Sequence, residues 1–157
     1  MQLEHTFAVR ADPDATYAFL IDVNRVATCI PGITSVEEQS PDTFLGVLRV
    51  KVGPVGITYR GTATITARDP ARRMATVEAE GNEGVGAGRV RATAVMTVDA
   101  TDEGSSVRIS TDLAIAGKLA GFGRGIIEGV AKRIVGEMAD CIRAELERDA
   151  DPAGVIA

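Results

Sequence analysis

Few side chains in this sequence have the type and spacing that catalysis or metal binding requires. His5 is the only histidine and lies in a segment that alternates like a β-strand, so we interpret it as a core or sheet-edge residue. Cys29 and Cys141 are far apart in the sequence, and no His/Cys/Asp group has metal-ligand spacing. We therefore expect no catalytic residue and no metal site. We interpret both cysteines as small apolar core residues that form no disulfide framework.

Two glycine-rich segments could be mistaken for phosphate-binding loops. Residues 84–88 precede a strand rather than a helix, so no helix N-terminus is available to hold a phosphate, and we interpret them as a mobile loop. Residues 117–125 do begin a helical pattern, but no second strand with a ribose-binding acid follows. Neither segment therefore predicts a nucleotide site.

The second glycine-rich segment is better interpreted as a gate. Its glycines would let the first helical turns shift, and Phe122 supplies one large apolar group. Lys118 and Arg124 could meet anionic lipid head groups. The simpler alternative, a tightly packed helix start with solvated charges, stays open. The predicted gate residues are Lys118, Leu119, Gly121, Phe122, Gly123, Arg124 and Gly125.

The elements that would position these residues follow from the hydrophobic pattern. Residues 3–9 alternate as a strand, Asp12 and Pro13 mark a helix start, and 23–30 suggest a second short helix. Six further strands are predicted at 33–38, 44–52, 57–68, 74–80, 90–98 and 107–115, with residues 81–84 as a turn. One long helical pattern then runs to about Arg148, a length of about 45 Å for about 30 residues.

The long strands separate polar from apolar faces cleanly, which is typical of an antiparallel sheet with one face covered. The C-terminal helix is the obvious cover, because it carries an apolar stripe at helical spacing. The sequence thus predicts an α+β fold in which a curved antiparallel sheet of about seven strands wraps on a long C-terminal helix, with two short helices after the first strand. Residues 1–148 form a single domain, and 149–157 form a flexible tail. The stripe comprises Leu119, Phe122, Ile126, Val130, Ile134, Met138, Ile142 and Leu146.

Composition narrows the class of partner. The net charge of −5 argues against nucleic acid as a partner. No signal peptide is visible, and no stretch of about 18 consecutive apolar residues occurs. Aromatic residues make up only 4% of a chain that is 45% hydrophobic, so the core is built from small side chains. Such a core either packs tightly or leaves an internal cavity, and the sequence leaves both open.

Three motifs carry a resemblance to a known family. They are Cys29-Ile30-Pro31-Gly32, then 51–55 (KVGPV) followed by 59–63 (YRGTA), and 117–125 (GKLAGFGRG). In this order they resemble the CoxG family of carbon monoxide dehydrogenase subunits, within the START/Bet v 1-like (SRPBCC) superfamily, over residues 1–148. The resemblance implies a helix-grip fold. Many members of that family continue through a linker into a hydrophobic C-terminal anchor, whereas the segment after the domain here offers only the apolar residues 154–157.

The resemblance implies an accessory protein rather than an enzyme. Its partner would be a molybdenum-containing carbon monoxide dehydrogenase or a related molybdenum hydroxylase, linked through it to the membrane and the respiratory quinone pool. We expect no covalent cofactor, a bound menaquinone-type quinone or lipid, and a cytoplasmic location with peripheral contact at the inner face of the cell membrane. The Tyr59 hydroxyl could bond a quinone carbonyl. The predicted ligand-binding residues are Leu48, Val50, Ile57, Tyr59, Met96, Ile109, Leu113, Phe122, Ile126 and Val130.

Two other functions remain open. A solid domain could recruit the dehydrogenase as a ligand-free interaction module, through a surface that includes the outward arginines Arg60, Arg89, Arg91 and Arg108. A polyketide-cyclase-like enzyme would instead need polar groups converging in a cavity, and the predicted inward faces offer little beyond Tyr59 and Thr111.

Overall fold

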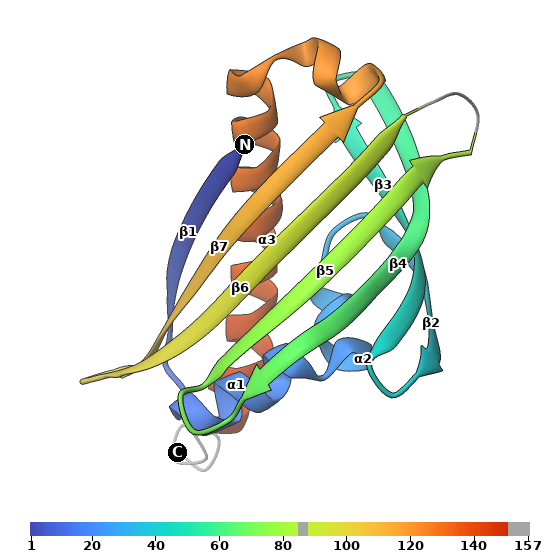
Figure 1. The fold of residues 1–157 in the computed structure, drawn as a ribbon. Coiled ribbons are helices and arrows are strands. Elements are labelled where there is room, and N and C mark those ends of the chain that lie inside the picture. Colours follow the sequence, from blue (N-terminus) through green and yellow to red (C-terminus); the bar gives the residue numbers. More distant parts are fainter. Residues whose placement is uncertain (85–87, 151–157) are drawn as a thin grey trace.

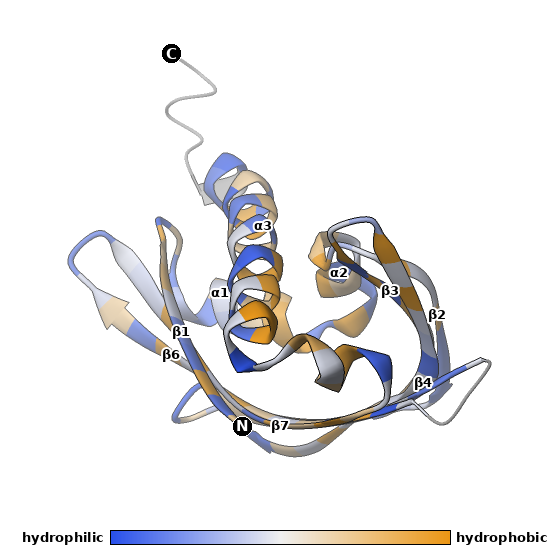
Figure 2. Cartoon of the chain, turned by 90° about the horizontal axis from the view of Figure 1, so that it is seen from above, coloured by the Kyte–Doolittle hydropathy of each residue, from blue (hydrophilic) through white to orange (hydrophobic). Residues whose placement is uncertain are grey.

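The computed structural model describes the backbone of residues 1–84 and 88–150, and side chains up to Arg148. Antiparallel strands form one sheet in the order β1-β7-β6-β5-β4-β3-β2, which curves around the long helix α3 (Figures 1 and 2). The strands are β1 (Gln2–Val9), β2 (Ile33–Ser40), β3 (Thr43–Val52), β4 (Val55–Asp69), β5 (Met74–Glu83), β6 (Arg89–Thr101) and β7 (Gly104–Ala116). The helices are α1 (Pro13–Ile21), α2 (Val23–Val26), η1 (Ala27–Cys29), η2 (Lys118–Phe122) and α3 (Arg124–Ala150). The predicted order of elements and the fold class are confirmed.

The short helices begin where the sequence predicts. Asp12 caps α1, since its carboxylate accepts hydrogen bonds from the backbone N–H groups of Asp14 (3.0 Å) and Ala15 (3.1 Å). The predicted helix over 23–30 is divided into α2 and the single 3₁₀ turn η1. Together these helices close one end of the curved sheet (Figure 1).

Helix α3 is anchored at its C-terminal half to the free edge of β1. The Arg143 Nε donates to the carbonyl oxygen of Ala8 (2.8 Å), and the carboxylate of Glu147 accepts from the backbone N–H of Arg10 (3.0 Å). These bonds satisfy edge groups that would otherwise be open to another strand. The C-terminal half of α3 is therefore fixed to the sheet.

Two predicted boundaries differ from the structure. The long helical pattern is interrupted at Gly123, because this residue adopts a backbone conformation (φ 86°) that L side chains rarely adopt, so η2 and α3 are separate helices. The predicted turn at 81–84 is instead the end of β5, which pairs with β6 as far as Asn82 and with β4 through Glu83. Both differences change which side chains face the interior.

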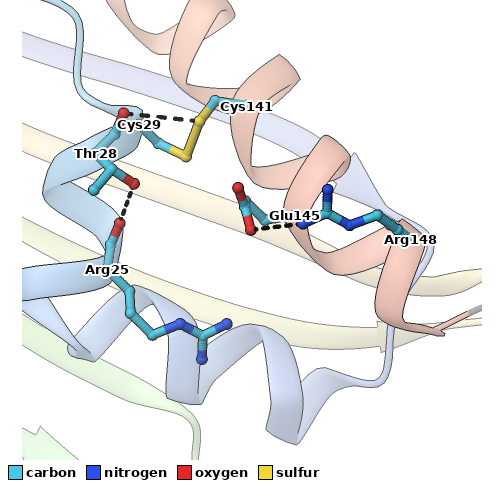
Figure 3. Close-up of a disulfide and its surroundings, with 6 residues drawn as sticks. All are labelled: Arg25, Thr28, Cys29, Cys141, Glu145 and Arg148. Atoms are coloured by element: carbon cyan, nitrogen blue, oxygen red, sulfur yellow. Dashed lines mark hydrogen bonds and ion pairs between the residues drawn. A yellow bond between two sulfur atoms is a disulfide. The ribbon is translucent and has the colours of Figure 1, made fainter.

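The interpretation of the cysteines as unpaired core residues is wrong. Cys29 in η1 and Cys141 in α3 form a disulfide that spans 112 residues of sequence (Figure 3). Cys29 itself is buried in the core, as expected for a small apolar residue. The bond adds a covalent anchor to the half of α3 that is already hydrogen-bonded to β1.

Two sequence segments lie outside the described residues. The loop predicted at 84–88 includes residues 85–87, and the predicted C-terminal tail includes residues 151–157. Within the described ranges, none of the helices combines the length and the apolar character that a bilayer crossing requires.

Candidate functional site

The inner face of the sheet carries two apolar clusters. The first packs α1, η1 and the C-terminal half of α3 against the sheet, with Phe19 and Ile142 fully buried. The second lies at the other end, beneath η2. Its buried members are Val50, Val52, Ile57, Tyr59, Leu119 and Ile127.

Between these clusters the inner face is built from small residues, which we call the floor. It consists of Gly46, Gly61, Ala63, Ala79 and Ala92, and strand register places them side by side, with Gly46 opposite Gly61 and Ala79 between Ala63 and Ala92. All five keep part of their surface accessible although they lie on the covered face of the sheet.

Helix α3 is supported towards the flanks of the sheet rather than over the floor. Its backbone approaches β1 and β3 more closely than the middle strands β4, β5 and β6. Val130 and Ile134, in the middle of the helix, are likewise only half-buried. The small side chains of the floor and the apolar side chains in the middle of α3 therefore both keep accessible surface between the two clusters.

Tyr59 lies where the floor meets the second cluster. It is 3% exposed, yet its hydroxyl has no hydrogen-bond partner among the described residues. Burial raises the pKa of Tyr59, and the nearby charge of Glu83 raises it further, so the phenol is neutral at pH 7 and available as a donor. An unpaired buried hydroxyl is unusual in a native core and indicates a missing partner.

The predicted gate packs against the cluster that contains Tyr59. Helix η2 contributes the buried Leu119 and the half-buried Phe122 to the cluster around Tyr59 (Figure 1, orange, at the top). Glycines with positive φ flank it on both sides, Gly117 (97°) as its N-cap and Gly123 (86°) as its C-cap. These two glycines adopt backbone conformations that L side chains rarely adopt, and they separate η2 from β7 and from α3.

The structure divides the predicted ligand-binding residues among three places. Seven of them join the second cluster: Leu48, Val50, Ile57, Tyr59, Leu113, Phe122 and Val130. Met96 and Ile109 belong to the first cluster instead. Ile126 is 49% exposed and lies on the surface beside the gate, because the break at Gly123 shifts the helical register and turns Ile127 inward in its place.

The predicted gate residues fall on both sides of η2. Leu119 and Phe122 face the cluster, whereas Lys118, Gly121, Gly123, Arg124 and Gly125 are exposed. Arg124 is paired with Glu128 one turn further along α3 (2.9 Å). The gate therefore has an apolar inner side and an outer side that bears two cations.

Sequence reasoning missed Glu83. The segment Gly81-Asn82-Glu83-Gly84 has the composition of a turn, but β5 continues through it and places Glu83 directly opposite Tyr59. The only sequence feature that could have placed Glu83 on the inner face is the alternation of β5. Continued beyond residue 80, this alternation puts Glu83 on the same face as Ala79 and Gly81.

Tyr59→Phe is expected to stabilise the ligand-free protein by about 1–3 kcal/mol, because it removes a buried polar group that has no partner. Tyr17, the other tyrosine, is the matched control, since its hydroxyl donates to the carbonyl oxygen of Met74 (2.7 Å). Tyr17→Phe should destabilise by about 0.5–1.5 kcal/mol. Urea denaturation of both variants measures the two shifts, and a loss of stability in Tyr59→Phe would contradict this description of the site.

Two shallow grooves lie outside the interior. One of about 430 Å³ crosses the ends of β5, β6 and β7 and includes Arg89 and Arg91, the latter paired with Glu80 (2.8 Å). The other, of about 400 Å³, lies between β1 and α3 and places the half-buried, edge-strand His5 near Glu128 and Lys132. Within the described residues no group of three or more His, Cys, Asp or Glu side chains could hold a metal ion.

Several solved structures share the fold of this chain. A conserved protein from Geobacillus kaustophilus superposes with a TM-score of 0.84 at 21% identity, covering 94% of this chain and 96% of that one. The Zhui aromatase/cyclase from Streptomyces sp. R1128 gives 0.71 at 22% identity, covering 98% of both chains. A START superfamily protein from Mycobacterium smegmatis gives 0.63 at 8% identity, covering 94% and 97%. These likenesses establish the START/Bet v 1-like helix-grip fold.

The sequence itself identifies the family. A search of curated proteins finds no match. The family model for CoxG, a subunit of carbon monoxide dehydrogenase, matches residues 6–147, which include every helix and strand of the domain except the outer ends of β1 and α3. The chain therefore belongs to the CoxG family of carbon monoxide dehydrogenase subunits.

Proposed function

We propose that this protein is a non-catalytic carrier that binds an apolar, membrane-derived molecule, a menaquinone-type quinone or a lipid, for a molybdenum-containing carbon monoxide dehydrogenase. The observation that carries the proposal is the unpartnered Tyr59 hydroxyl, buried in the cluster that η2 contacts and beside the partly accessible small residues of the floor. A polar head would bond Tyr59, and an alkyl tail would lie between the floor and α3. Family membership supports the enzyme partner.

The head group and the tail would contribute differently to binding. Moving an alkyl chain out of water gains about 0.8 kcal/mol per CH₂, whereas moving it out of a bilayer gains far less because the chain is already dry. Binding from a membrane therefore depends on the polar head and on opening the gate. The segment also carries three exposed residues that would suit contact with a membrane surface, the apolar Ile126 and the cations Lys118 and Arg124.

A catalytic role is the weaker candidate. One structural neighbour is an aromatase/cyclase, but at 22% identity this likeness concerns the fold. Strand register places the polar residues Tyr59, Glu83 and Thr111 on the inner face of the middle strands. Among the described residues neither the Tyr59 hydroxyl nor Oε1 of Glu83 has a hydrogen-bond partner, so these two groups form no hydrogen-bonded acid–base pair.

The test is extraction from vesicles. Ligand-free protein is mixed with anionic phospholipid vesicles that contain a menaquinone, the vesicles are removed by flotation, and quinone and lipid in the protein fraction are quantified by mass spectrometry. We expect one bound molecule per chain. Protein that stays empty here, and that also shows no bound quinone or lipid by native mass spectrometry when purified from its own host, would reject the carrier function.

Gly123→Ala is expected to release a bound naphthoquinone to acceptor vesicles about 5- to 100-fold faster than the unmodified protein. The reason is that an Ala at this φ costs about 1–3 kcal/mol in the closed gate. Gly121→Ala is the matched control, because Gly121 lies within η2, two residues before Gly123, and does not have a positive φ. A Cβ added at either glycine would meet nothing within 4 Å. Stopped-flow transfer measures both rates. Equal rates in the two variants would show that η2 is not the moving element.

A further inference from the structure

Two buried polar atoms without partners belong to residues that are paired across neighbouring strands. Among the described residues, neither the Tyr59 hydroxyl nor Oε1 of Glu83 has a hydrogen-bond partner. The two residues are register partners on β4 and β5, so their side chains project from the same face of the sheet. Their proximity is also evident in the pKa of Tyr59, which the Glu83 charge raises.

The chain makes room for the Glu83 carboxylate. Gly88, at the start of β6, lies against it, and a Cβ at Gly88 would come within 2.5 Å of Oε1. Any other residue at Gly88 would therefore displace the carboxylate from its position. A buried carboxylate oxygen without a hydrogen-bond donor lowers the stability of the ligand-free protein. Such an unpartnered atom is the pattern expected of a binding site, where a ligand supplies the donor.

The two groups make complementary demands on a ligand. A phenol hydroxyl donates one hydrogen bond and can also accept, whereas an ionised carboxylate only accepts. A head group that satisfies both must therefore offer an acceptor oxygen to Tyr59 and an O–H or N–H donor to Glu83. A head group with carbonyl oxygens alone would satisfy Tyr59 and leave Glu83 unpartnered.

We propose that Tyr59 and Glu83 form the head-group site and that Glu83 selects hydroxyl-bearing ligands, the phenol or hydroquinone class, over carbonyl-only quinones with the same tail. This inference rests on the carrier function proposed above and adds its chemical selectivity. A protein built in this way retains the hydroxyl form of a redox-active ring and releases the oxidised form more readily.

A pair of redox-stable probes tests the selectivity. One is a 1,4-naphthoquinone with a short prenyl tail, and the other is the 4-methoxy-1-naphthol with the same tail, which keeps one acceptor oxygen and one hydroxyl. Fluorescence titration should give about tenfold or greater preference for the naphthol, since a hydrogen bond to a charged group contributes about 1.5–3 kcal/mol. Tyr59→Phe should weaken binding of both probes.

Glu83→Gln should bring the two affinities within about threefold, because the amide can donate to a carbonyl as well as accept from a hydroxyl. Glu80→Gln is the control, since Glu80 lies on the same strand but faces outward and pairs with Arg91. Gly88→Ala should also reduce the preference, since it moves the carboxylate without changing its charge. These two variants together keep the test valid if one of them folds poorly.

The outcomes separate this inference from the carrier function. If the unmodified protein binds both probes with equal affinity, or if Glu83→Gln keeps the full preference, the selectivity is wrong while the carrier function stands. If the unmodified protein binds neither probe and takes up nothing from vesicles, the carrier function itself fails.

Discussion

Replacing Cys29 and Cys141 together by alanine is expected to lower the free energy of unfolding by about 4–5 kcal/mol. The disulfide joins residues 112 positions apart, and in the chain-entropy model a cross-link that closes a loop of about 100 residues contributes about 4.7 kcal/mol. Urea denaturation of the oxidised protein and of the double variant measures this difference.

Thiol titration provides the control for this prediction. The unreduced protein, unfolded in denaturant, should show no free thiol, and reductant should release two. Two free thiols before reduction, or the same denaturation midpoint in the double variant, would contradict the cross-link.

The disulfide cross-links one end of α3, whereas the predicted gate lies at the other end. Cys141 lies in the half of α3 that Arg143 bonds to β1 and Glu147 bonds to Arg10, and Cys29 in η1 belongs to the first cluster. Figure 3 shows the bond between the two cysteines. The gate lies at the opposite end of α3, between two positive-φ glycines. We therefore infer that ligand exchange deforms the gate and the first turns of α3, while the cross-linked end holds the fold together.

Local patterns were sufficient to predict the sheet and the covering helix. Strands such as β4 and β7 alternate over many residues, and a slip of one residue would expose their whole apolar face, so the sequence specifies which face is buried. The N-cap of α1 is equally local, because Asp12 and Pro13 are adjacent.

The site depends on long-range relations that no local pattern contains. The floor exists only because register aligns Ala63 with Ala79 and Ala92, and register on β4 is shifted between Ile65 and Ala67 by an irregularity that the sequence does not mark. The pairing of Cys29 with Cys141 likewise depends on the tertiary fold, which brings these two residues together. Gly123 was misinterpreted for a different reason, since a glycine within a helical pattern does not reveal its φ.

Ala92→Phe is the most direct test of whether the space above the floor accepts a ligand. Ala92 lies near the start of β6, between Ala79 on β5 and Leu113 on β7, and is only half-buried. A phenyl ring there would occupy the position proposed for the tail. We expect quinone extraction from vesicles to fall by at least about tenfold, equivalent to about 1.4 kcal/mol of binding.

The sign of the change in unfolding free energy caused by Ala92→Phe distinguishes a domain with an internal cavity from one whose interior is fully packed. If the floor borders unfilled apolar space, the new ring buries surface there and the free energy of unfolding stays level or rises, by up to about 2 kcal/mol. If the interior is already filled, as an interaction module without a ligand would require, the ring must displace its neighbours at a cost of about 1–3 kcal/mol.

Thr93→Phe is the matched control, because Thr93 is the next residue on β6 and its side chain projects from the opposite, outer face. It should leave both extraction and stability nearly unchanged. A destabilised Ala92→Phe that still extracts quinone would be incompatible with a tail bound on the floor. A stable variant that no longer extracts would show that this surface accommodates the ligand, because a defect in folding could not then explain the loss.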